Sequence, residues 1–498
     1  MLHSYLEKSL KTKPEKIYLR TGSRTYTFQN IYDKAREYQA ILLKWGLKKG
    51  DRVLIYSSKN SVSVALMIAC SMSEAIYVPV SSLNPAVRAK YITEETDSKF
   101  ILCDEPCKIN LLGTGLKVEL IHEEENTSFF YRPTGKLTVT DHPLPAFILF
   151  TSGSTGTAKG VVISHNAAMV FVDWAAMEFK IEERDVLASI APFNFDLSVF
   201  DIYVSARQSS SLVLYTEDET KNAMLMAQNI SNDKITTIYA TPTFYSTLAL
   251  YGKLHKHEYS LLKNILFAGE VFHMESFNTL LEHWPDKNYV NLYGPTETNV
   301  CTFFNVDLQN MNYPVFPIGK ACDYAASLLL DDAGNEIVHP NTNAELLISG
   351  KSLFNEYWAD QSKTEQTIYF DKNGNRFYRT GDIVYKNNEG NLIYVGRNDR
   401  MIKKNGFRIE PLEIEKVMMN YPGISAAAIT FSKEQNLLCC FYESPDRMEF
   451  DLSELKRFCQ NHLASYMIPD KFVLLHTMPK TSSGKIDLQA LNKQIDGY

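Results

Sequence analysis

Residues 151–160 read Thr-Ser-Gly-Ser-Thr-Gly-Thr-Ala-Lys-Gly, a run of small hydroxyl residues and glycines that includes a lysine. Glycines let backbone N–H groups turn toward an anion, the hydroxyls add donors, and Lys159 adds positive charge. The apolar segments 146–150 and 161–163 on either side predict two buried strands. We therefore expect a phosphate-binding loop between two strands rather than a flexible Gly/Ser linker.

This loop differs from a Walker-type P-loop in its details. That motif has Gly-Lys-Ser/Thr after four free positions, and it leads from a strand into a helix. Here Ala158 precedes the lysine, Gly160 follows it, and the next segment reads as a strand. A P-loop kinase is therefore disfavoured.

The composition excludes several classes of protein. A chain of 498 residues with 45% hydrophobic and 22% charged residues predicts a globular protein of two or more domains. The net charge of −7 argues against a nucleic-acid partner. No signal-peptide pattern is present, and apolar stretches such as 64–70 are too short to span a membrane. The eight cysteines are scattered without zinc spacing, which favours reduced thiols in a cytoplasmic protein.

The order of apolar and polar segments predicts an α/β fold followed by a smaller domain. Strand-like and helix-like segments alternate from about residue 17 to 397, for example strand 52–56, helix 61–73 and strand 75–79, which predicts largely parallel sheets. Residues 327–350 instead indicate small antiparallel hairpins. The charged stretch 397–406 suits a hinge, and the last hundred or so residues suffice for a small α+β domain.

Three further segments bear chemistry: 291–297 (Asn-Leu-Tyr-Gly-Pro-Thr-Glu), 378–382 (Tyr-Arg-Thr-Gly-Asp) and 479–485 (Pro-Lys-Thr-Ser-Ser-Gly-Lys). Each alone has an ordinary interpretation, as a turn, a capped strand end or a basic loop. In this order after the 151–160 loop, they make the chain resemble the adenylate-forming superfamily along nearly its whole length. That superfamily includes acyl-CoA synthetases, luciferases and the adenylation domains of nonribosomal peptide synthetases.

The resemblance implies three parts. Residues 1–396 form a large N-terminal domain of layered α/β subdomains with a small β-barrel-like subdomain, and residues 397–400 form a hinge centred on Asp399. Residues 401–498 form a mobile α+β lid that rotates between two half-reactions. The family often has glycines at positions 341 and 344. Asn341 tolerates a left-handed backbone and Ala344 does so less well, so the local turn is expected to differ.

The resemblance also implies an ATP site. Asn291 and Tyr293 contact adenine, Thr296 reaches the α-phosphate, and Asp382 binds the ribose. The full set of implied ATP-binding positions is Thr151, Ser152, Gly153, Ser154, Thr155, Gly156, Lys159, Gly269, Glu270, Asn291, Leu292, Tyr293, Gly294, Thr296, Asp382, Tyr394 and Arg397. Glu297 is the Mg²⁺ ligand, with Thr155.

The implied catalytic residues are Lys485, Thr296 and Glu297. When a substrate carboxylate attacks the α-phosphate of ATP, Lys485 and Mg²⁺ can neutralise the charge that develops there. The lid then turns to withdraw Lys485, and a thiol attacks the mixed anhydride. Gly406 matches the position where the thiol arm passes, and a side chain there would obstruct it.

The segment 194–200 indicates which acid is activated. Asp196 matches the aspartate that pairs with the ammonium in amino-acid-activating members of the family; its ordinary alternative is an N-cap for the helix that follows. The implied substrate pocket is almost wholly apolar, which favours a small apolar amino acid. Its positions are Asp196, Leu197, Phe200, Tyr239, Leu266, Ala268, Leu292, Val300, Cys301 and Lys485.

This set of pocket residues resembles that of free-standing L-prolyl–carrier-protein ligases. The implied reaction is ATP-dependent activation of L-proline and its transfer to the phosphopantetheine of a carrier protein. No carrier motif follows Lys485, so the carrier is expected to act in trans. A D-alanine–carrier-protein ligase remains the close alternative, although that family usually has an indole in place of Tyr239 and a cysteine in place of Ala268. An acyl-CoA synthetase for a small acid and a non-catalytic adenylate-binding protein are less favoured.

Overall fold

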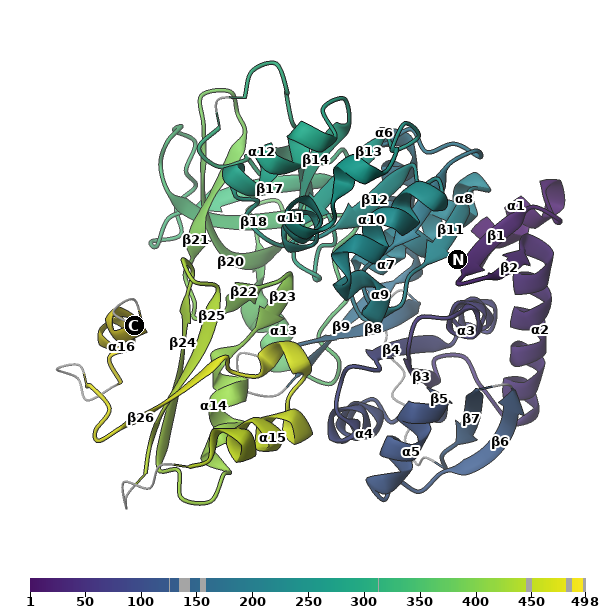
Figure 1. Cartoon of the computed structure of the whole chain (residues 1–498), viewed down its shortest axis with the longest axis horizontal. Coiled ribbons are helices and arrows are strands. Elements are labelled where there is room, and N and C mark those ends of the chain that lie inside the picture. The colour runs from purple at the N-terminus through teal and green to yellow at the C-terminus, as the bar shows by residue number, and fades with distance from the viewer. Residues whose placement is uncertain are drawn as a thin grey trace.

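The computed structural model describes residues 1–124, 126–133, 144–152, 158–311, 313–444, 450–480 and 486–495 (Figure 1). A large body comprises two extended sheets and a small antiparallel sheet, and a smaller C-terminal domain lies against it. The predicted α/β class is confirmed.

The first sheet has seven strands in the order β6-β7-β5-β3-β4-β8-β9. β3, β4, β5 and β8 are parallel, whereas β6, β7 and β9 pair antiparallel. Its strands are β3 (Arg52–Ser57), β4 (Ile76–Ser81), β5 (Phe100–Asp104), β6 (Glu119–Glu124), β7 (Thr127–Tyr131), β8 (Pro145–Thr151) and β9 (Lys159–Ser164). The helices of this region are α2 (Phe28–Lys44), α3 (Ser61–Met72), α4 (Ala86–Glu95) and α5 (Glu105–Gly113).

The second sheet has nine strands in the order β16-β15-β14-β13-β12-β10-β11-β1-β2, and its central strands are parallel. Its strands are β1 (Ile17–Thr21), β2 (Arg24–Thr27), β10 (Val186–Ser189), β11 (Ser211–Leu214), β12 (Thr237–Ala240), β13 (Asn264–Ala268), β14 (Asn288–Tyr293), β15 (Thr302–Asn305) and β16 (Lys320–Ala321). The associated helices are α1 (His3–Thr12), α6 (His165–Glu178), α7 (Leu197–Val199), a π-helix (Phe200–Val204), α8 (Ser205–Gln208), α9 (Glu217–Lys221), α10 (Ala223–Asn232), α11 (Pro242–Tyr251) and α12 (Met274–His283).

One apolar cluster joins the two sheets. It contains Val53 of β3, Leu187 of β10 and most of α3. The helix α3 is apolar around its circumference, which is typical of a helix enclosed on all sides. The core therefore fixes the two sheets relative to each other.

The third sheet follows the second in the chain and is antiparallel, as the sequence predicts for residues 327–350. Asn341 has φ +58°, whereas Ala344 is the first residue of β18, so only the first of these positions needed a left-handed backbone. The elements are β17 (Ala325–Leu330), β18 (Ala344–Gly350), α13 (Gln361–Thr367), β19 (Ile368–Phe370), β20 (Arg376–Lys386) and β21 (Leu392–Arg397).

The C-terminal domain has its own core, built around residues such as Ile414, Cys440 and Leu455. A bend separates β21 from its first strand, at the place of the predicted hinge. Its elements are β22 (Ile402–Lys404), β23 (Phe407–Ile409), α14 (Pro411–Met419), β24 (Ala426–Ser432), β25 (Leu437–Glu443), α15 (Leu452–His462), β26 (Lys471–Leu475) and α16 (Leu488–Ile495). Across the described ranges, no helix is both long enough and apolar enough to cross a membrane.

Candidate active site

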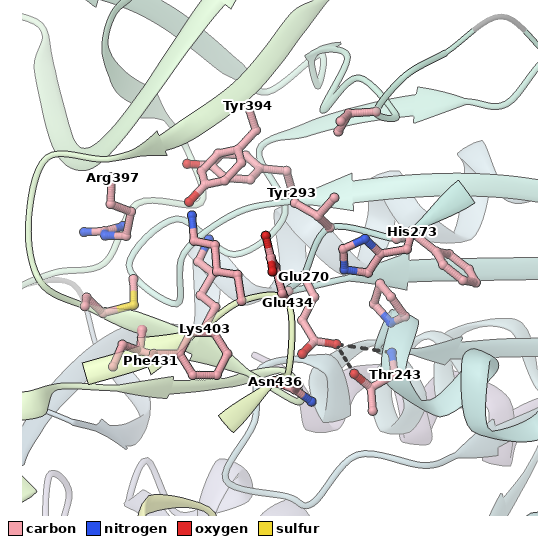
Figure 2. A pocket seen from close by; sticks show the side chains of 18 of the residues that line it. Thr243, Glu270, His273, Tyr293, Tyr394, Arg397, Lys403, Phe431, Glu434 and Asn436 are labelled. Carbon is pink, nitrogen blue, oxygen red and sulfur yellow. Dashed lines mark hydrogen bonds between the residues drawn. The ribbon is translucent and has the colours of Figure 1, made fainter. Parts of the chain in front are cut away.

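A cavity of about 850 Å³ lies between the large body and the C-terminal domain (Figure 2). Its floor is formed at the carboxyl ends of β13 and β14, where ligands bind in open α/β sheets. Residues of β21, of the hinge and of β22 close another side. The structure therefore brings together eight of the positions predicted to bind ATP: Gly269, Glu270, Asn291, Leu292, Tyr293, Gly294, Tyr394 and Arg397.

Asp382 is buried and contacts two residues that line this cavity, Tyr293 and Arg397. It is 1% exposed, accepts a hydrogen bond from the Tyr293 hydroxyl at 2.5 Å, and pairs with the Arg397 guanidinium at 2.5 Å. Lys403 adds a cation 3.7 Å away. In this lid orientation the predicted ribose ligand is thus engaged by side chains that line the cavity.

Glu270 also has a structural role. Its carboxylate accepts hydrogen bonds from the backbone N–H and the hydroxyl of Thr243, at 3.2 and 2.7 Å (Figure 2). Thr243 lies in the first turn of α11, where a negative charge is favourable. The glutamate therefore fixes this helix against the cavity wall.

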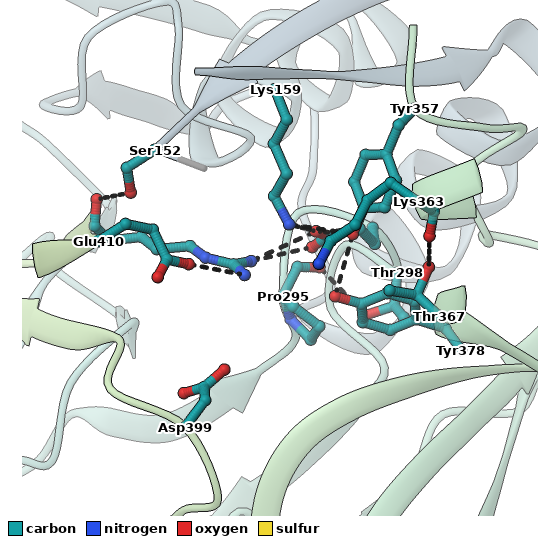
Figure 3. A network of polar contacts seen from close by, with 12 residues as sticks. Ser152, Lys159, Pro295, Thr298, Tyr357, Lys363, Thr367, Tyr378, Asp399 and Glu410 are labelled. Carbon is teal, nitrogen blue, oxygen red and sulfur yellow. Dashed lines mark hydrogen bonds and ion pairs between the residues drawn. The ribbon is translucent and has the colours of Figure 1, made fainter. Parts of the chain in front are cut away.

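Figure 3 shows a polar network that includes Lys159, Tyr357 and Tyr378. The predicted Mg²⁺ ligand Glu297 is at the centre of this network. Its carboxylate is fully buried and accepts from Lys159 at 3.0 Å and from the Tyr357 hydroxyl at 2.6 Å. The Arg408 guanidinium lies 3.3 and 3.4 Å from its two oxygens. Burial alone would raise the pKa of Glu297, but Lys159 and Arg408 outweigh it and hold that pKa well below its usual range. Thr296 precedes this glutamate on the same loop.

Lys159 has a lowered pKa of about 8, because burial and the nearby Arg408 outweigh the attraction of Glu297. Its ammonium also lies 4.4 Å from the centre of the Tyr357 ring. The lysine of the predicted phosphate loop is therefore directed at the anionic centre of the site.

Arg408 comes from β23 of the C-terminal domain and was not among the predicted site residues. Its backbone carbonyl accepts a hydrogen bond from Ser152 at 2.6 Å, and its guanidinium lies 3.5 Å from Glu410. The motif around Gly406 places this arginine two residues from the predicted thiol passage, but only the fold shows that it reaches Glu297.

Gly406 lies against the wall of the large body. Its φ is +78°, and a Cβ at this position would lie 2.2 Å from Cγ2 of Thr241. Gly269 faces it across the gap, since a Cβ there would lie 3.7 Å from the Gly406 Cα. Both the backbone conformation and the lack of space explain why a glycine occupies this position.

Five predicted residues, Gly153, Ser154, Thr155, Gly156 and Lys485, lie outside the described residues. The ends of the phosphate loop are described: Thr151 and Lys159 are partners in the β8–β9 antiparallel pair. The two predicted strands are confirmed. The buried Thr151 hydroxyl has no hydrogen-bond partner within the described ranges.

The apolar positions predicted for the substrate pocket are buried together. Tyr239 pairs in register with Leu266, and Ala268 pairs with Leu292, across the adjacent strands β12, β13 and β14. The ring of Phe200 lies edge-on to Tyr239, with 5.4 Å between the ring centres. The buried members of the set are Leu197, Phe200, Tyr239, Leu266, Ala268, Leu292, Val300 and Cys301.

Asp196 stands at the start of the short helix α7. Its side chain makes no capping hydrogen bond, so the N-cap interpretation is not supported. Burial, with a contribution from Glu297, raises its pKa to about 7. Burial raises the pKa of Tyr239, and the charge of Asp196 adds to that rise. Asp196 directly precedes Leu197 of the apolar set.

A two-sheet body, a small domain that closes a nucleotide-sized cavity, and a buried carboxylate that faces lysine and arginine define an adenylate-forming enzyme. The family models of the AMP-binding enzyme and of its C-terminal domain match residues 6–358 and 413–485. The chain belongs to the AMP-binding enzyme family. It is therefore an AMP-forming ligase, and it uses ATP.

Two relatives match nearly the whole chain. An L-proline–[L-prolyl-carrier protein] ligase from Streptomyces coelicolor is 32% identical, over 94% of this chain and 92% of the relative. One from Pseudomonas fluorescens is 30% identical over 100% of both. Among solved structures, that of IdnL1 is similar with a TM-score of 0.82 and 26% identity, and the match covers 96% of this chain and 98% of that chain.

Proposed function

We propose that this enzyme activates L-proline with ATP as prolyl-AMP, releasing pyrophosphate, and transfers the prolyl group to the phosphopantetheine thiol of a separate carrier protein. The observation that carries the proposal is that the apolar side chains expected around the substrate are buried together, with Asp196 directly before the first of them, Leu197. The names of the two relatives add support, since both are prolyl–carrier-protein ligases.

The chemistry of the pocket suits a cyclic amino acid. The ammonium of proline has two N–H donors for Asp196, and the ring carbons need only apolar neighbours. A charged or strongly polar substrate side chain would lose its hydration without gaining a partner among these residues. The rings of Phe200 and Tyr239 bound the space on one side.

The first half-reaction takes place where the pocket meets the ATP cavity. The substrate carboxylate attacks the α-phosphorus of ATP, the bond to the bridging oxygen breaks, and pyrophosphate leaves with that electron pair. Lys159 contributes positive charge on the phosphate side, and Thr296 is proposed to contact the α-phosphate. Lys485 is proposed to enter the site when the lid rotates about Asp399.

Glu297 fits a role as magnesium ligand, because Mg²⁺ prefers carboxylate oxygens. When bound, Mg²⁺ supplies positive charge to the phosphates. In the described lid orientation, Lys159 and Arg408 supply the counter-charge of this carboxylate instead. Glu297 would hold the metal if these two cations moved away from it, and Thr155, which lies outside the described residues, is the second proposed ligand.

The described lid orientation suits the second half-reaction. The thiolate sulfur attacks the acyl carbon of prolyl-AMP, the thioester bond forms, and AMP leaves with the electrons of the acyl–oxygen bond. The β22–β23 hairpin brings Gly406 against Thr241 of the large body, at the place where the thiol arm is proposed to pass. A cytoplasmic location is part of the proposal, supported by eight free, buried cysteines.

Amino-acid-dependent ATP–pyrophosphate exchange tests the proposal, with a panel of L-proline, D-proline, D-alanine, L-alanine and L-valine. We expect L-proline to dominate. A dominant D-alanine signal would keep the mechanism and refute the substrate. Thioester formation with carrier protein, but not with free coenzyme A, would separate the ligase from an acyl-CoA synthetase.

A further inference from the structure

Asp196 lies on a loop that begins at the carboxyl end of β10 and ends in the π-helix. A π-helix contains an extra residue per turn and often occurs beside a functional site. This segment includes Phe200, whose side chain packs on Tyr239. The position of the Asp196 carboxylate therefore depends on how both ends of the loop are held.

Lys59 holds the beginning of the loop. It precedes α3 in a different part of the chain and is 3% exposed. Its ammonium donates hydrogen bonds to the backbone carbonyls of Ser189 at 2.9 Å and Ile190 at 2.8 Å. These are the last residue of β10 and the first residue after it. A single buried cation thus fixes the point where the strand becomes the loop.

Asp201 lies at the other end of the same segment. It is fully buried in the π-helix, where Lys59 and the Ser189 side chain both act on its carboxylate. Burial raises its pKa, and the charge of Lys59 opposes that rise. The carboxylates that act on Lys59 are those of Glu217, Asp201 and Glu219. Only Asp201 among these belongs to the segment that carries Asp196.

We propose that Lys59 is a positioning residue for substrate recognition, because it holds the start of the segment 189–201, which carries Asp196, in place. Two hydrogen bonds from its ammonium fix the start of this segment, where β10 ends. This inference rests on the proposed role of Asp196 as the partner of the substrate ammonium. Lys59 itself touches no substrate and acts through the loop.

The test compares two substrates that differ only in the ammonium. L-proline and tetrahydrofuran-2-carboxylate have similar rings, but the second has an oxygen in place of the N–H₂⁺ group. Adenylation of each is measured with hydroxylamine trapping, and the ratio of the two kcat/KM values reports how well Asp196 is placed. If the wild-type chain prefers another amino acid, that amino acid and its 2-hydroxy analogue replace the pair. The test therefore does not depend on L-proline being the substrate.

Lys59→Met removes the charge and both donors at similar volume. We expect kcat/KM for L-proline, divided by kcat/KM for tetrahydrofuran-2-carboxylate, to fall at least tenfold, toward the value for Asp196→Ala. The KM for ATP should stay within twofold of wild type. A loss that is equal for both substrates would show a merely structural role and would overturn the proposal. Arg52→Met is the matched control, since Arg52 is a buried cation at the other end of β3. It donates to the carbonyls of Thr96 and Gly50, away from the site, so its ratio should stay unchanged.

The double variant Lys59→Met with Asp201→Asn covers the case in which Lys59→Met does not fold. It removes both buried charges, so its melting temperature should exceed that of Lys59→Met. The two carbonyl hydrogen bonds stay lost, and we expect the low substrate ratio to persist. A wild-type ratio in this double variant would refute the proposal, because charge balance alone would then be sufficient.

Discussion

At the scale of single residues, the pKa of Asp196 predicts a pH dependence. Its pKa is raised to about 7, so the carboxyl group is neutral at lower pH and loses its attraction for an ammonium. We expect kcat/KM for the amino acid to fall about tenfold per pH unit below that value. Pyrophosphate exchange between pH 5.5 and 8.5 measures it.

The control for this prediction is Asp196→Asn, which should have low activity without the acidic limb. In the wild type, the KM for ATP should not change over the pH range in which kcat/KM for the amino acid falls. A flat profile for the amino acid across the same range would contradict the assigned role of Asp196.

The size of two pocket residues predicts substrate preference. Tyr239 and Ala268 lie on neighbouring strands and border the space proposed for the proline ring. Tyr239→Trp and Ala268→Cys should each reduce kcat/KM for L-proline at least about 10-fold, because a change of only one methylene in such a pocket already alters it by about 10- to 200-fold. Activity on alanine should fall less. Exchange assays over the amino-acid panel measure the ratio, and equal losses on both substrates would argue against this pocket.

At the scale of elements, the β22–β23 hairpin is proposed to serve the second half-reaction. Gly406 has a positive φ and no room for a Cβ beside Thr241. Gly406→Leu should lower thioester formation about a hundredfold, since strain of about 2–3 kcal/mol corresponds to that factor. Pyrophosphate exchange should stay within about threefold of wild type.

Both rates are measured on the same preparation, with radiolabelled amino acid and carrier protein for the transfer. Gly390→Leu is a suitable control, because Gly390 also has a positive φ but its nearest neighbour is the flexible end of Lys320. If Gly406→Leu reduced both half-reactions equally, the hairpin would not be specific to thiol transfer.

At the scale of the whole molecule, a buried ion pair joins the two domains. Arg88 of α4 pairs with Glu413 of α14, and both side chains are nearly excluded from solvent. This contact exists in the described lid orientation. Arg88→Met should therefore disfavour that orientation and slow thioester formation about tenfold, equivalent to about 1.4 kcal/mol. Pyrophosphate exchange should be unchanged or faster.

Lys108→Met is the matched control, because Lys108 forms ion pairs with Glu105 and Glu123 within the large body. It should leave both half-reactions unchanged. Unaltered thioester formation in a folded Arg88→Met variant would show that this contact does not govern the lid.

The sequence determined the chemistry of this protein through short motifs. Loop 151–160 was identified from residue type and order, whereas the roles of Glu297 and of the apolar set around Tyr239 were implied by the resemblance to the adenylate-forming superfamily. The α/β class followed from alternating apolar segments, because those patterns record local burial. The boundaries at 396 and 400 and the roles of individual site residues stay predictions.

Only the tertiary structure decided which charges meet. The contacts of Arg408 with Glu297 span 111 residues, and that of Lys59 with Ser189 spans 130. Glu270 was predicted to line the nucleotide site, and the fold shows that it also caps α11. The spacing of apolar and polar residues does not predict such long-range contacts, because they form where segments that are distant in the sequence lie side by side in the fold. Residue types therefore specify the reaction, whereas packing of the sheets and the lid sets the charge balance around it.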